Sequence, residues 1–213
     1  MDWSRPPGVT RLILVRHGET EASARGRCIG RTDIALSEGG RLQAVALASR
    51  LLRAGAVAVY ASTSRRAVET ADPIATALGV EVRRLADLCE VDFGVLEGLT
   101  FEEVEASHPL TWAEWMRSPT EVRFPGGEAM DDVARRARRA RSQVLATCPG
   151  QAVVIVSHGG PLRVLLADAL GLGLARCFDL TVRHGSTHVL EFGPLTNGRR
   201  ASRVAPGFSF GTR

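Results

Sequence analysis

Two histidines of this chain follow apolar runs of the same pattern. Residues 12–15 read LILV and lead into Arg16 and His17, while residues 152–157 read AVVIVS and lead into His158. Short apolar runs are typical of buried strands in a parallel sheet, and open α/β sheets hold their ligands at the carboxyl ends of the strands. An imidazole beside an arginine suits an anion, as a nucleophile, base or hydrogen-bond donor. The sequence therefore predicts one anion site between two strand-end histidines.

Further polar segments follow in a recognisable order. They are GRTDIALSEGGRLQA at 30–44, the S-x-x-x-R-A-x-x-T-A pattern that starts at Ser62, CEVDFGVLEG at 89–98 and VSHGG at 156–160. Together with Arg-His-Gly at 16–18, these segments resemble the motifs of the histidine phosphatase superfamily, also called the phosphoglycerate mutase-like family. The resemblance runs from residue 11 to about residue 165 and is far more specific than a single short motif.

Alternating strand and helix patterns must place these residues. Apolar runs with helical patterns between them indicate βαβ units around a largely parallel sheet. We expect an α/β fold, a three-layer αβα sandwich with a mostly parallel central sheet and a small helical cap insertion. The expected strands are 11–15, 56–61, 80–85, 152–157 and 187–192, the last antiparallel at an edge, and the expected helices are 37–53, 64–78, 126–147 and 160–171.

The length of 213 residues predicts a single domain over residues 1–213. Between about 97 and 127 the pattern changes, with a capping-box start at Thr100 and Glu103 followed by the aromatic-rich HPLTWAEWMRSP. This segment predicts a cap over the strand ends, where substrate choice is commonly made. The glycines, prolines and polar residues from about residue 193 onward predict a loosely held tail.

The resemblance implies catalytic roles for five residues. His17 would attack a phosphate monoester and become a phosphohistidine, so its attacking nitrogen must be unprotonated. Arg16 and Arg66 would keep that ring neutral and clamp the phosphoryl oxygens, with His158 as a further donor. Glu90 would protonate the leaving oxygen and later accept a proton from the attacking water. A structural alternative for Glu90 is that it caps its own loop or pairs with an arginine.

Four more residues are predicted to bind substrate beside Arg16, Arg66 and His158. They are Ser23, Gly30, Gly159 and Glu128. Ser23 stands where the family usually has an asparagine, and a hydroxyl reaches less far than an amide. For Glu128, and equally for Glu97, a structural role fits the sequence as well as contact with substrate does.

Two other motifs have simpler interpretations. Arg183, His184 and Gly185 also spell Arg-His-Gly, but no Glu-Thr follows. We therefore interpret His184, and likewise His188, as loop and strand residues near the site rather than as substrate contacts. The run RRARRAR at 135–141 would suit nucleic acid, yet it follows acidic residues on a helix with an apolar stripe. Pairs of the type Asp132 with Arg136 predict a solvated charged face instead.

Composition excludes several classes of function. All 27 basic residues are arginine, which excludes a P-loop lysine and a Schiff-base lysine. The net charge of +4 suits anionic small molecules and is too small to indicate nucleic acid. The four cysteines are widely spaced, so we expect reduced packing residues, with no metal site and no cofactor. Without a long apolar run or a signal-peptide core, the expected location is the cytoplasm, with no membrane partner.

Three hypotheses for the function remain open. The first is a phosphatase acting on a small phosphorylated metabolite. Within this class, the segments GRCIGRTD at 26–33, CEVDFGVLEG and FPGGEAM look most similar to the α-ribazole phosphatase type of the family. The second is a cofactor-dependent phosphoglycerate mutase. The third is a non-enzymatic module that binds a phosphate ligand, which is weaker because no core residue is missing. A homo-oligomer is compatible with all three.

Overall fold

The fold is built on one six-stranded sheet with strand order β3-β2-β4-β1-β5-β6. It is seen in a computed structural model in which residues 3, 6–194 and 202–204 are described. The four strands from β3 to β1 run parallel, β5 is antiparallel to β1, and β6 is antiparallel to β5. Their bounds are β1 Thr10–Arg16, β2 Ala56–Ala61, β3 Val82–Arg84, β4 Ala152–Ser157, β5 Thr187–Phe192 and β6 Ser202–Val204.

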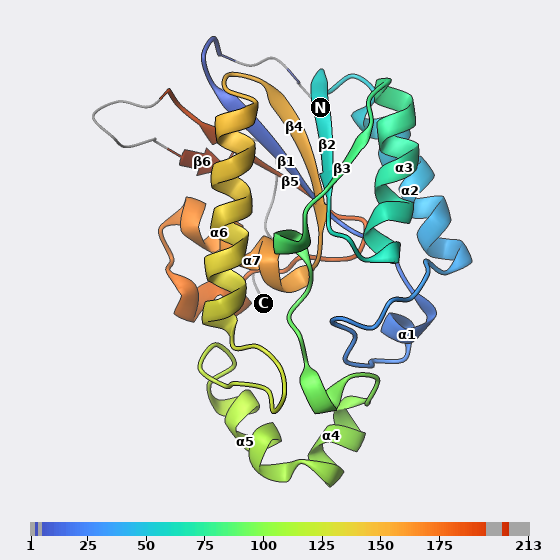
Figure 1. Ribbon diagram of the computed structural model, residues 1–213, viewed down its shortest axis with the longest axis vertical. Coiled ribbons are helices and arrows are strands. Elements are labelled where there is room, and N and C mark those ends of the chain that lie inside the picture. The colour runs from blue at the N-terminus through green and yellow to red at the C-terminus, as the bar shows by residue number, and fades with distance from the viewer. Residues whose placement is uncertain (1–2, 4–5, 195–201, 205–213) are drawn as a thin grey trace.

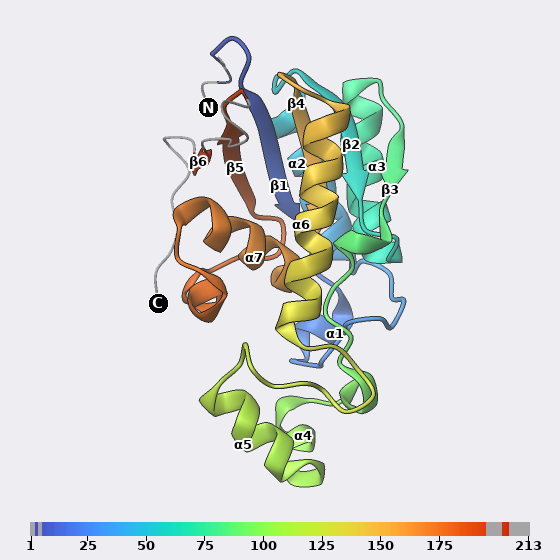
Figure 2. The ribbon, with the colours of Figure 1, turned by 60° about the vertical axis from the view of Figure 1, so that its left-hand side comes forward.

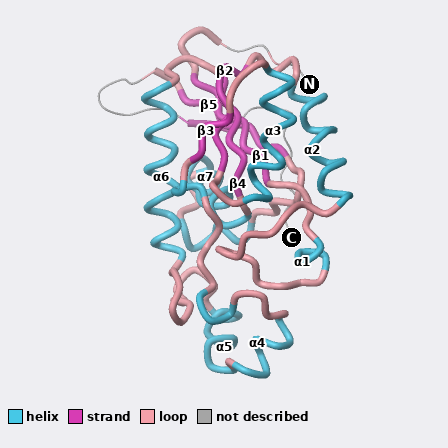
Figure 3. Tube along the Cα trace, turned by 45° about the vertical axis from the view of Figure 1, so that its right-hand side comes forward, coloured by secondary structure: helices cyan, strands magenta, loops and turns pink. Residues whose placement is uncertain are grey.

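Helices cover both faces of this sheet, as Figure 3 shows. One face carries α2 (Glu38–Leu51) and α3 (Arg65–Leu78), and the other carries α6 (Met130–Thr147) and α7 (Gly159–Leu170). Successive side chains of a strand point to opposite faces, so Leu12 and Leu14 of β1 enter the core under α6 and α7. Ile13 and Val15 enter the other core. The predicted three-layer αβα sandwich is confirmed.

Several element bounds differ from the sequence-based expectations. The helix expected from residue 126 begins at Met130, because Gly126 adopts a left-handed φ of 71° and the Gly127 amide closes a turn onto the Phe124 carbonyl. β5 is antiparallel as predicted, but it is not at the edge. Ser202–Val204 pair with it as β6, which corrects the loosely held tail at these residues. The other tail residues after Pro194 lie outside the described residues.

The cap consists of α4 (Phe101–Ser107) and α5 (Pro109–Arg117), which stand beyond the carboxyl end of β1 in Figures 1 and 2. The capping box predicted for α4 is present, since Thr100 and Glu103 each bond the other's backbone amide. Around Trp115, aromatic rings pack edge to face or tilted, with Phe124 at 4.9 Å and Phe101 at 5.6 Å between centroids.

The remaining short elements line the connections. They are α1 (Glu21–Ala24) and the 3-10 turns η1 (Ala86–Leu88), η2 (Gly94–Leu96) and η3 (Leu174–Asp179). Both α1 and η1 lie just after strand ends in the chain, so their residues reach the same side of the sheet as the cap. The carboxyl edge of the sheet is therefore enclosed by α1, the loop that follows η1, and the cap.

Candidate active site

Strand register brings the two predicted histidines together. β1 and β4 are neighbouring parallel strands in which Arg16 lies opposite Ser157, so the next residue of each strand is a histidine at the same level. The backbone amide of His17 continues the ladder by donating to the Ser157 carbonyl at 3.0 Å. The ring centroids of His17 and His158 are 4.9 Å apart. The pair predicted from two separate motifs is thus one site.

A pocket of about 140 Å³ opens over this edge of the sheet. Its floor includes Arg16, His17 and Arg66, and Glu90 forms part of its wall. Its remaining described lining residues come from α1 and the following loop, from the cap side and from a loop before β5: Thr20, Ser23, Arg27, Cys28, Ile29, Phe93, Phe101, Trp115 and His184. One half of the pocket is cationic and the other is largely apolar, which suits an anionic group joined to an organic one.

His17 is held in the form that a nucleophile needs. Its Nδ1 lies 2.7 Å from the Gly18 carbonyl oxygen, which can only accept a hydrogen bond. Nδ1 therefore carries the proton, and Nε2 presents its lone pair. Burial, followed by the charges of Arg66 and Arg16, lowers the pKa of His17 well below its usual 6.5. The ring is neutral at physiological pH.

His158 is fully buried beside His17. Its Nε2 lies 2.8 Å from the Ser62 hydroxyl, at the carboxyl end of β2. Burial, the neighbouring His17 and Arg66 lower the pKa of His158 well below 6.5. Among the described residues its Nδ1 has no hydrogen-bond partner, although it is buried. If Ser62 donates to Nε2, Nδ1 carries a proton that a phosphoryl oxygen could accept.

Two arginines supply the positive charge of the site. Arg16 donates from Nη1 to the Val182 carbonyl at 2.6 Å, while its buried Nε has no partner among the described residues. Arg66, on the first turn of α3, donates to the carbonyls of Gly30 and Thr32 at 2.8 and 2.9 Å. Burial lowers the pKa of Arg16 to about 10, so it remains a cation at neutral pH. A bound anion would satisfy the buried Nε.

Glu90 lies at the start of α7. Its carboxylate accepts the Gly160 amide at 3.0 Å and its own neighbour's amide, that of Val91, at 2.9 Å. A Cβ on Gly160 would lie 2.5 Å from the Glu90 carboxylate, so the glycine is needed for this close approach. The positive end of the α7 dipole also stabilises the negative charge of this carboxylate. Glu90 therefore does cap a helix, and it lines the pocket as well.

The backbone of the Glu90 loop is fixed by Arg136 of α6, a role that sequence reasoning missed. Arg136 is buried and donates to the carbonyls of Cys89 and Glu90, the latter at 2.9 Å. It also forms two 3.0 Å hydrogen bonds to the Glu128 carboxylate. The predicted Asp132–Arg136 pair on a solvated face is therefore wrong, because Arg136 points inward.

The other arginines of the run also pair with acidic residues, Arg135 with Asp132 of its own helix and the rest with neighbouring elements. Arg138 and Arg141 both bond Asp168 of α7, and Arg139 bonds Asp87 of η1. Most of these guanidinium groups are partly exposed. These ion pairs connect α6 to the elements beside it. They explain the arginine run without a role in binding nucleic acid.

The other predicted binding residues lie close to the site with different roles. Ser23 lines the pocket, and its hydroxyl also closes the capping box of α1 with Thr20. Glu128 accepts the Asp92 amide as well as Arg136, and it does not line the pocket among the described residues. Gly159 opens α7 beside Glu90 and Arg163, where a Cβ would lie 2.8 Å from Arg163. Because Gly159 has no side chain, the Glu90 carboxylate and the Arg163 guanidinium can both lie close to the start of α7.

Gly30 and Glu97 form one structural unit. The Glu97 carboxylate accepts the backbone amides of Gly30, Arg31 and Thr32 at 2.9 to 3.2 Å. Burial alone would raise the pKa of Glu97, but the hydrogen bond from the Thr32 hydroxyl, together with those from the amides, lowers it. The carbonyls of the same loop hold Arg66. Glu97 is thus a positioning residue for Arg66, and the Gly30 amide is already occupied.

The glycine after His17 serves a close approach between two segments. A Cβ on Gly18 would lie 2.5 Å from the Gly40 carbonyl oxygen, and one on Gly40 would lie 2.1 Å from that of Glu19. The Gly18 amide donates to the Thr70 hydroxyl at 3.1 Å, which in turn donates to the Arg66 carbonyl. These contacts explain why glycines at positions 18 and 40 and a threonine at position 70 fit this part of the site.

His184 is the site residue that sequence reasoning undervalued. It lines the pocket, and its ring centroid lies 5.1 Å from that of His17. Burial, Arg16 and Arg66 lower the pKa of His184 to about 4. The repeated Arg-His-Gly at 183–185 is the available signal, but the missing Glu-Thr after it favours a loop residue near the site. The sequence alone does not show that this loop returns beside His17 before β5.

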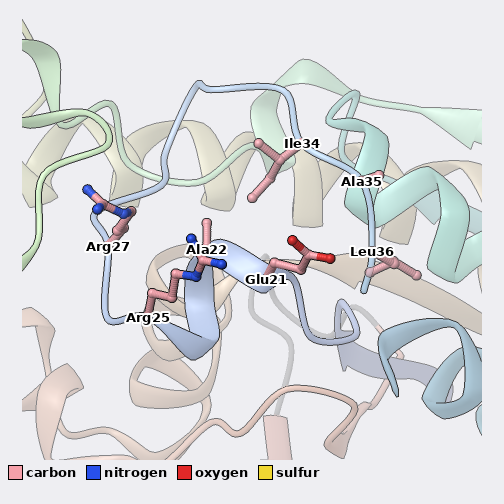
Figure 4. A pocket seen from close by; sticks show the side chains of 7 residues that line it. All are labelled: Glu21, Ala22, Arg25, Arg27, Ile34, Ala35 and Leu36. Atoms are coloured by element: carbon pink, nitrogen blue, oxygen red, sulfur yellow. The ribbon is translucent and has the colours of Figure 1, made fainter. Parts of the chain in front are cut away.

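A second, larger hollow of about 450 Å³ lies beside α1 (Figure 4). Its lining includes Glu21 and Arg25 from α1 and its end, and Ile34 and Leu36 from the loop before α2. Arg27 borders both this hollow and the catalytic pocket. The organic half of a substrate could therefore extend along this side.

Metal-binding and membrane-spanning features were sought over the same parts of the chain. In residues 3, 6–194 and 202–204, no group of three or more His, Cys, Asp or Glu is arranged to hold a metal ion. None of the described helices has the length and apolar character needed to cross a membrane. The four cysteines are buried and free.

The comparisons with known proteins agree with this geometry. A family model described as "Histidine phosphatase superfamily (branch 1)" matches residues 12–201. The chain belongs to the histidine phosphatase superfamily. Two curated relatives are similar over most of the chain. They are the "Bifunctional protein Rv2228c" of Mycobacterium tuberculosis, 40% identical over 89% of this chain and 52% of that protein, and "Phosphoserine phosphatase 1" of Hydrogenobacter thermophilus, 35% identical over 86% and 87%.

The chain spans about half the length of the first of these relatives. Among solved structures, the mycobacterial glucosyl-3-phosphoglycerate phosphatase Rv2419c in complex with VO3 has a TM-score of 0.81 at 31% identity, covering 91% of this chain and 96% of that one. An α-ribazole phosphatase from Shigella flexneri has a TM-score of 0.82 at 24% identity, covering 95% and 99%. That last likeness shows the fold alone.

Proposed function

We propose that this protein hydrolyses small phosphomonoesters through a phosphohistidine on His17. The observation that carries the proposal is the state of His17, a neutral ring whose Nδ1 faces the Gly18 carbonyl and whose other nitrogen is available between Arg16 and Arg66. Neutral imidazole is a competent nucleophile, and the arginines offset the charge of the phosphoryl group. Phosphoryl transfer depends mainly on such positioning and charge.

In the first step, His17 Nε2 forms a bond to phosphorus and the bond to the leaving oxygen breaks. Glu90, once protonated, gives its proton to that oxygen, which departs as an alcohol. In the second step, water attacks phosphorus while Glu90 accepts a proton, the phosphorus–nitrogen bond breaks, and inorganic phosphate leaves. The placement of Glu90 in the pocket wall supports its double role.

The covalent step is tested by rapid quench with a labelled substrate. The wild-type protein should retain phosphate that is labile to acid and stable to base, and His17→Ala should retain none. A wild-type protein that releases phosphate without any trapped intermediate would contradict the mechanism, as would full activity in His17→Ala.

For the substrate, we propose a small phosphorylated metabolite with an organic group that fits the cap side of the pocket. The aromatic wall of Phe101 and Trp115 supports α-ribazole 5′-phosphate, whose leaving group carries an aromatic base. Arg27 supports a leaving group with a carboxylate, such as phosphoserine. Its Nη1 donates to the Gly98 carbonyl at 2.6 Å and pairs with Glu103, and the described residues leave its Nε and Nη2 without a hydrogen bond.

A panel of phosphomonoesters decides between these substrates. Values of kcat/KM for α-ribazole phosphate, phosphoserine and glycerol phosphate rank the two recognition modes against a small reference. If α-ribazole phosphate is no better than glycerol phosphate, that assignment fails.

We propose net hydrolysis in the cytoplasm rather than mutase activity, so 3-phosphoglycerate with a trace of the 2,3-bisphosphate should yield little 2-phosphoglycerate. Isomerisation faster than hydrolysis would support the mutase instead.

A further inference from the structure

The loop before β5 is bonded directly to the backbone of the catalytic strand. Gly185, which has a left-handed φ of 66°, donates its amide to the carbonyls of Arg16 and His17 at 3.1 and 3.2 Å. The Arg16 amide donates in return to the Ser186 carbonyl at 3.1 Å. These backbone hydrogen bonds hold the segment of His184 beside the segment of His17, and they thereby keep the two rings in contact.

Among the described residues, His184 differs from the other histidines of this region in that its ring makes no hydrogen bond. His17 bonds Gly18, His158 bonds Ser62 and His188 bonds the Ser186 hydroxyl. The ring of His184 is partly buried and lines the pocket. A ligand in the pocket can therefore supply the hydrogen-bond partner of this ring.

The position of His184 favours the phosphoryl group over the leaving group as that partner. Its ring centroid is 5.1 Å from that of His17, nearly the same separation as the 4.9 Å between His17 and His158. In the proposed mechanism, the phosphorus atom would bond to His17 and the leaving oxygen would face Glu90, which protonates it. An imidazole beside His17 is thus within reach of an equatorial oxygen.

We propose that His184 is a catalytic residue that donates a hydrogen bond from its ring to an oxygen of the transferring phosphoryl group. This inference rests on the proposed function. Being neutral in the free protein, His184 provides a donor without adding a charge that would compete with Arg16 and Arg66 or protonate His17. It would act as a third imidazole in a pocket where two are already assigned by the motifs.

Orthovanadate, a phosphate analogue, provides the direct test. His184→Phe keeps an aromatic ring against His17 but removes both ring nitrogens, and His184→Asn restores a short donor. A lost hydrogen bond to a charged group corresponds to roughly a 10- to 100-fold weaker inhibition by vanadate in the phenylalanine variant. We expect a similar loss of kcat/KM on an alkyl phosphate and on nitrophenyl phosphate. His184→Asn should recover part of the vanadate affinity.

Arg183→Gln is the matched control, since Arg183 is the exposed neighbour in the same loop. It should leave vanadate inhibition and activity unchanged. Thermal unfolding is measured for every variant, and where the phenylalanine variant does not fold, the asparagine variant is compared with wild type instead. Wild-type vanadate affinity in a folded variant would overturn the role of His184.

The pattern of substrate loss separates the remaining outcomes. A loss confined to one leaving group would also overturn the phosphoryl contact, because it would place His184 on the leaving-group side. Failure of the proposed function has a different signature, in which the wild-type protein itself traps no phosphate on His17. A normal trap in wild type together with normal vanadate affinity in His184→Phe refutes the inference alone.

Discussion

At the scale of single residues, the proposed nucleophile His17 and the proposed general acid Glu90 are held by backbone hydrogen bonds. The Gly18 carbonyl sets the tautomer of His17, and the Gly160 amide at the start of α7 holds Glu90. In a flexible loop, the other tautomer of the imidazole and other positions of the carboxylate would also be populated. The chemistry therefore depends on groups that do not themselves react.

Glu90→Gln tests the acid directly. Glutamine keeps the size of the side chain and can still accept the Gly160 amide, but it cannot protonate a leaving oxygen. We expect kcat/KM to fall by about 10²- to 10⁴-fold on an alkyl phosphate, and far less on nitrophenyl phosphate, whose leaving group needs no proton. Steady-state rates on the two esters measure the ratio. Equal losses would assign Glu90 a purely structural role.

His17 and His158 could be predicted because the signal lies in consecutive residues, a strand pattern followed directly by a histidine. Arg136 and Glu97 could not be predicted in the same way. Arg136 belongs to a run of identical residues, and only packing against the Glu90 loop turns this one inward. Glu97 receives its amides from a loop far away in the chain. The structural half of the site depends on tertiary contacts.

At the scale of elements, α6 supports the Glu90 loop from below. Arg136→Met would take the guanidinium away from the Glu128 carboxylate, which keeps the Asp92 amide, and from the carbonyls of the loop at 87–90. Removing one member of a buried pair costs about 3–5 kcal/mol of the free energy of unfolding. Urea unfolding measures this loss. Arg135→Met, at the exposed neighbouring position, is the control, and it should change stability by no more than about 0.5 kcal/mol.

If Arg136→Met proves as stable as the control, the hydrogen bonds to the loop contribute little. The companion variant Glu128→Gln separates the two parts of the network, because it keeps an acceptor for Arg136 while removing the carboxylate charge. A smaller loss in Glu128→Gln than in Arg136→Met is expected.

The cap offers a contrast between substrate contact and packing. Trp115 lines the pocket and is also central to the aromatic contacts of the cap. Trp115→Ala should raise KM for a base-containing phosphomonoester if the ring acts as a platform, with glycerol phosphate little affected. A packing role alone predicts a lower Tm and a loss shared by all substrates. Met116→Ala, at a half-exposed cap position, is the control.

At the scale of the whole molecule, the histidines make the fold sensitive to acid. Burial lowers the pKa of His17 and His158 well below 6.5, and that of His184 and His188 to about 4. The unfolded chain takes up these protons near pH 6.5, whereas the folded chain resists them. Stability is therefore complete above about pH 6.5 and is lost as the pH falls towards 4.

For His17 and His158, the loss amounts to at most about 1.4 kcal/mol per group for each pH unit below the unfolded pKa. Urea unfolding at about pH 7.5 and about pH 5 should show this decrease. The buried carboxylates with lowered pKa values, such as Asp168, contribute only at lower pH. His188→Gln should show a smaller decrease between the two pH values than wild type, and equal stability of the wild type at both would contradict the assignment.

The two histidines of the proposed mechanism directly follow β1 and β4, which each have a strand on both sides. Strands in that position open only when the entire sheet does, so the His17 amide, bonded to Ser157, should be among the slowest to exchange its hydrogen for deuterium. The cap has no such neighbours. Its amides should exchange by local opening, and its two tryptophans should report a transition in denaturant before phosphatase activity towards nitrophenyl phosphate disappears. In this protein the centre of the sheet around His17 would be the last part to unfold. The cap, which is proposed to select the substrate, would unfold first.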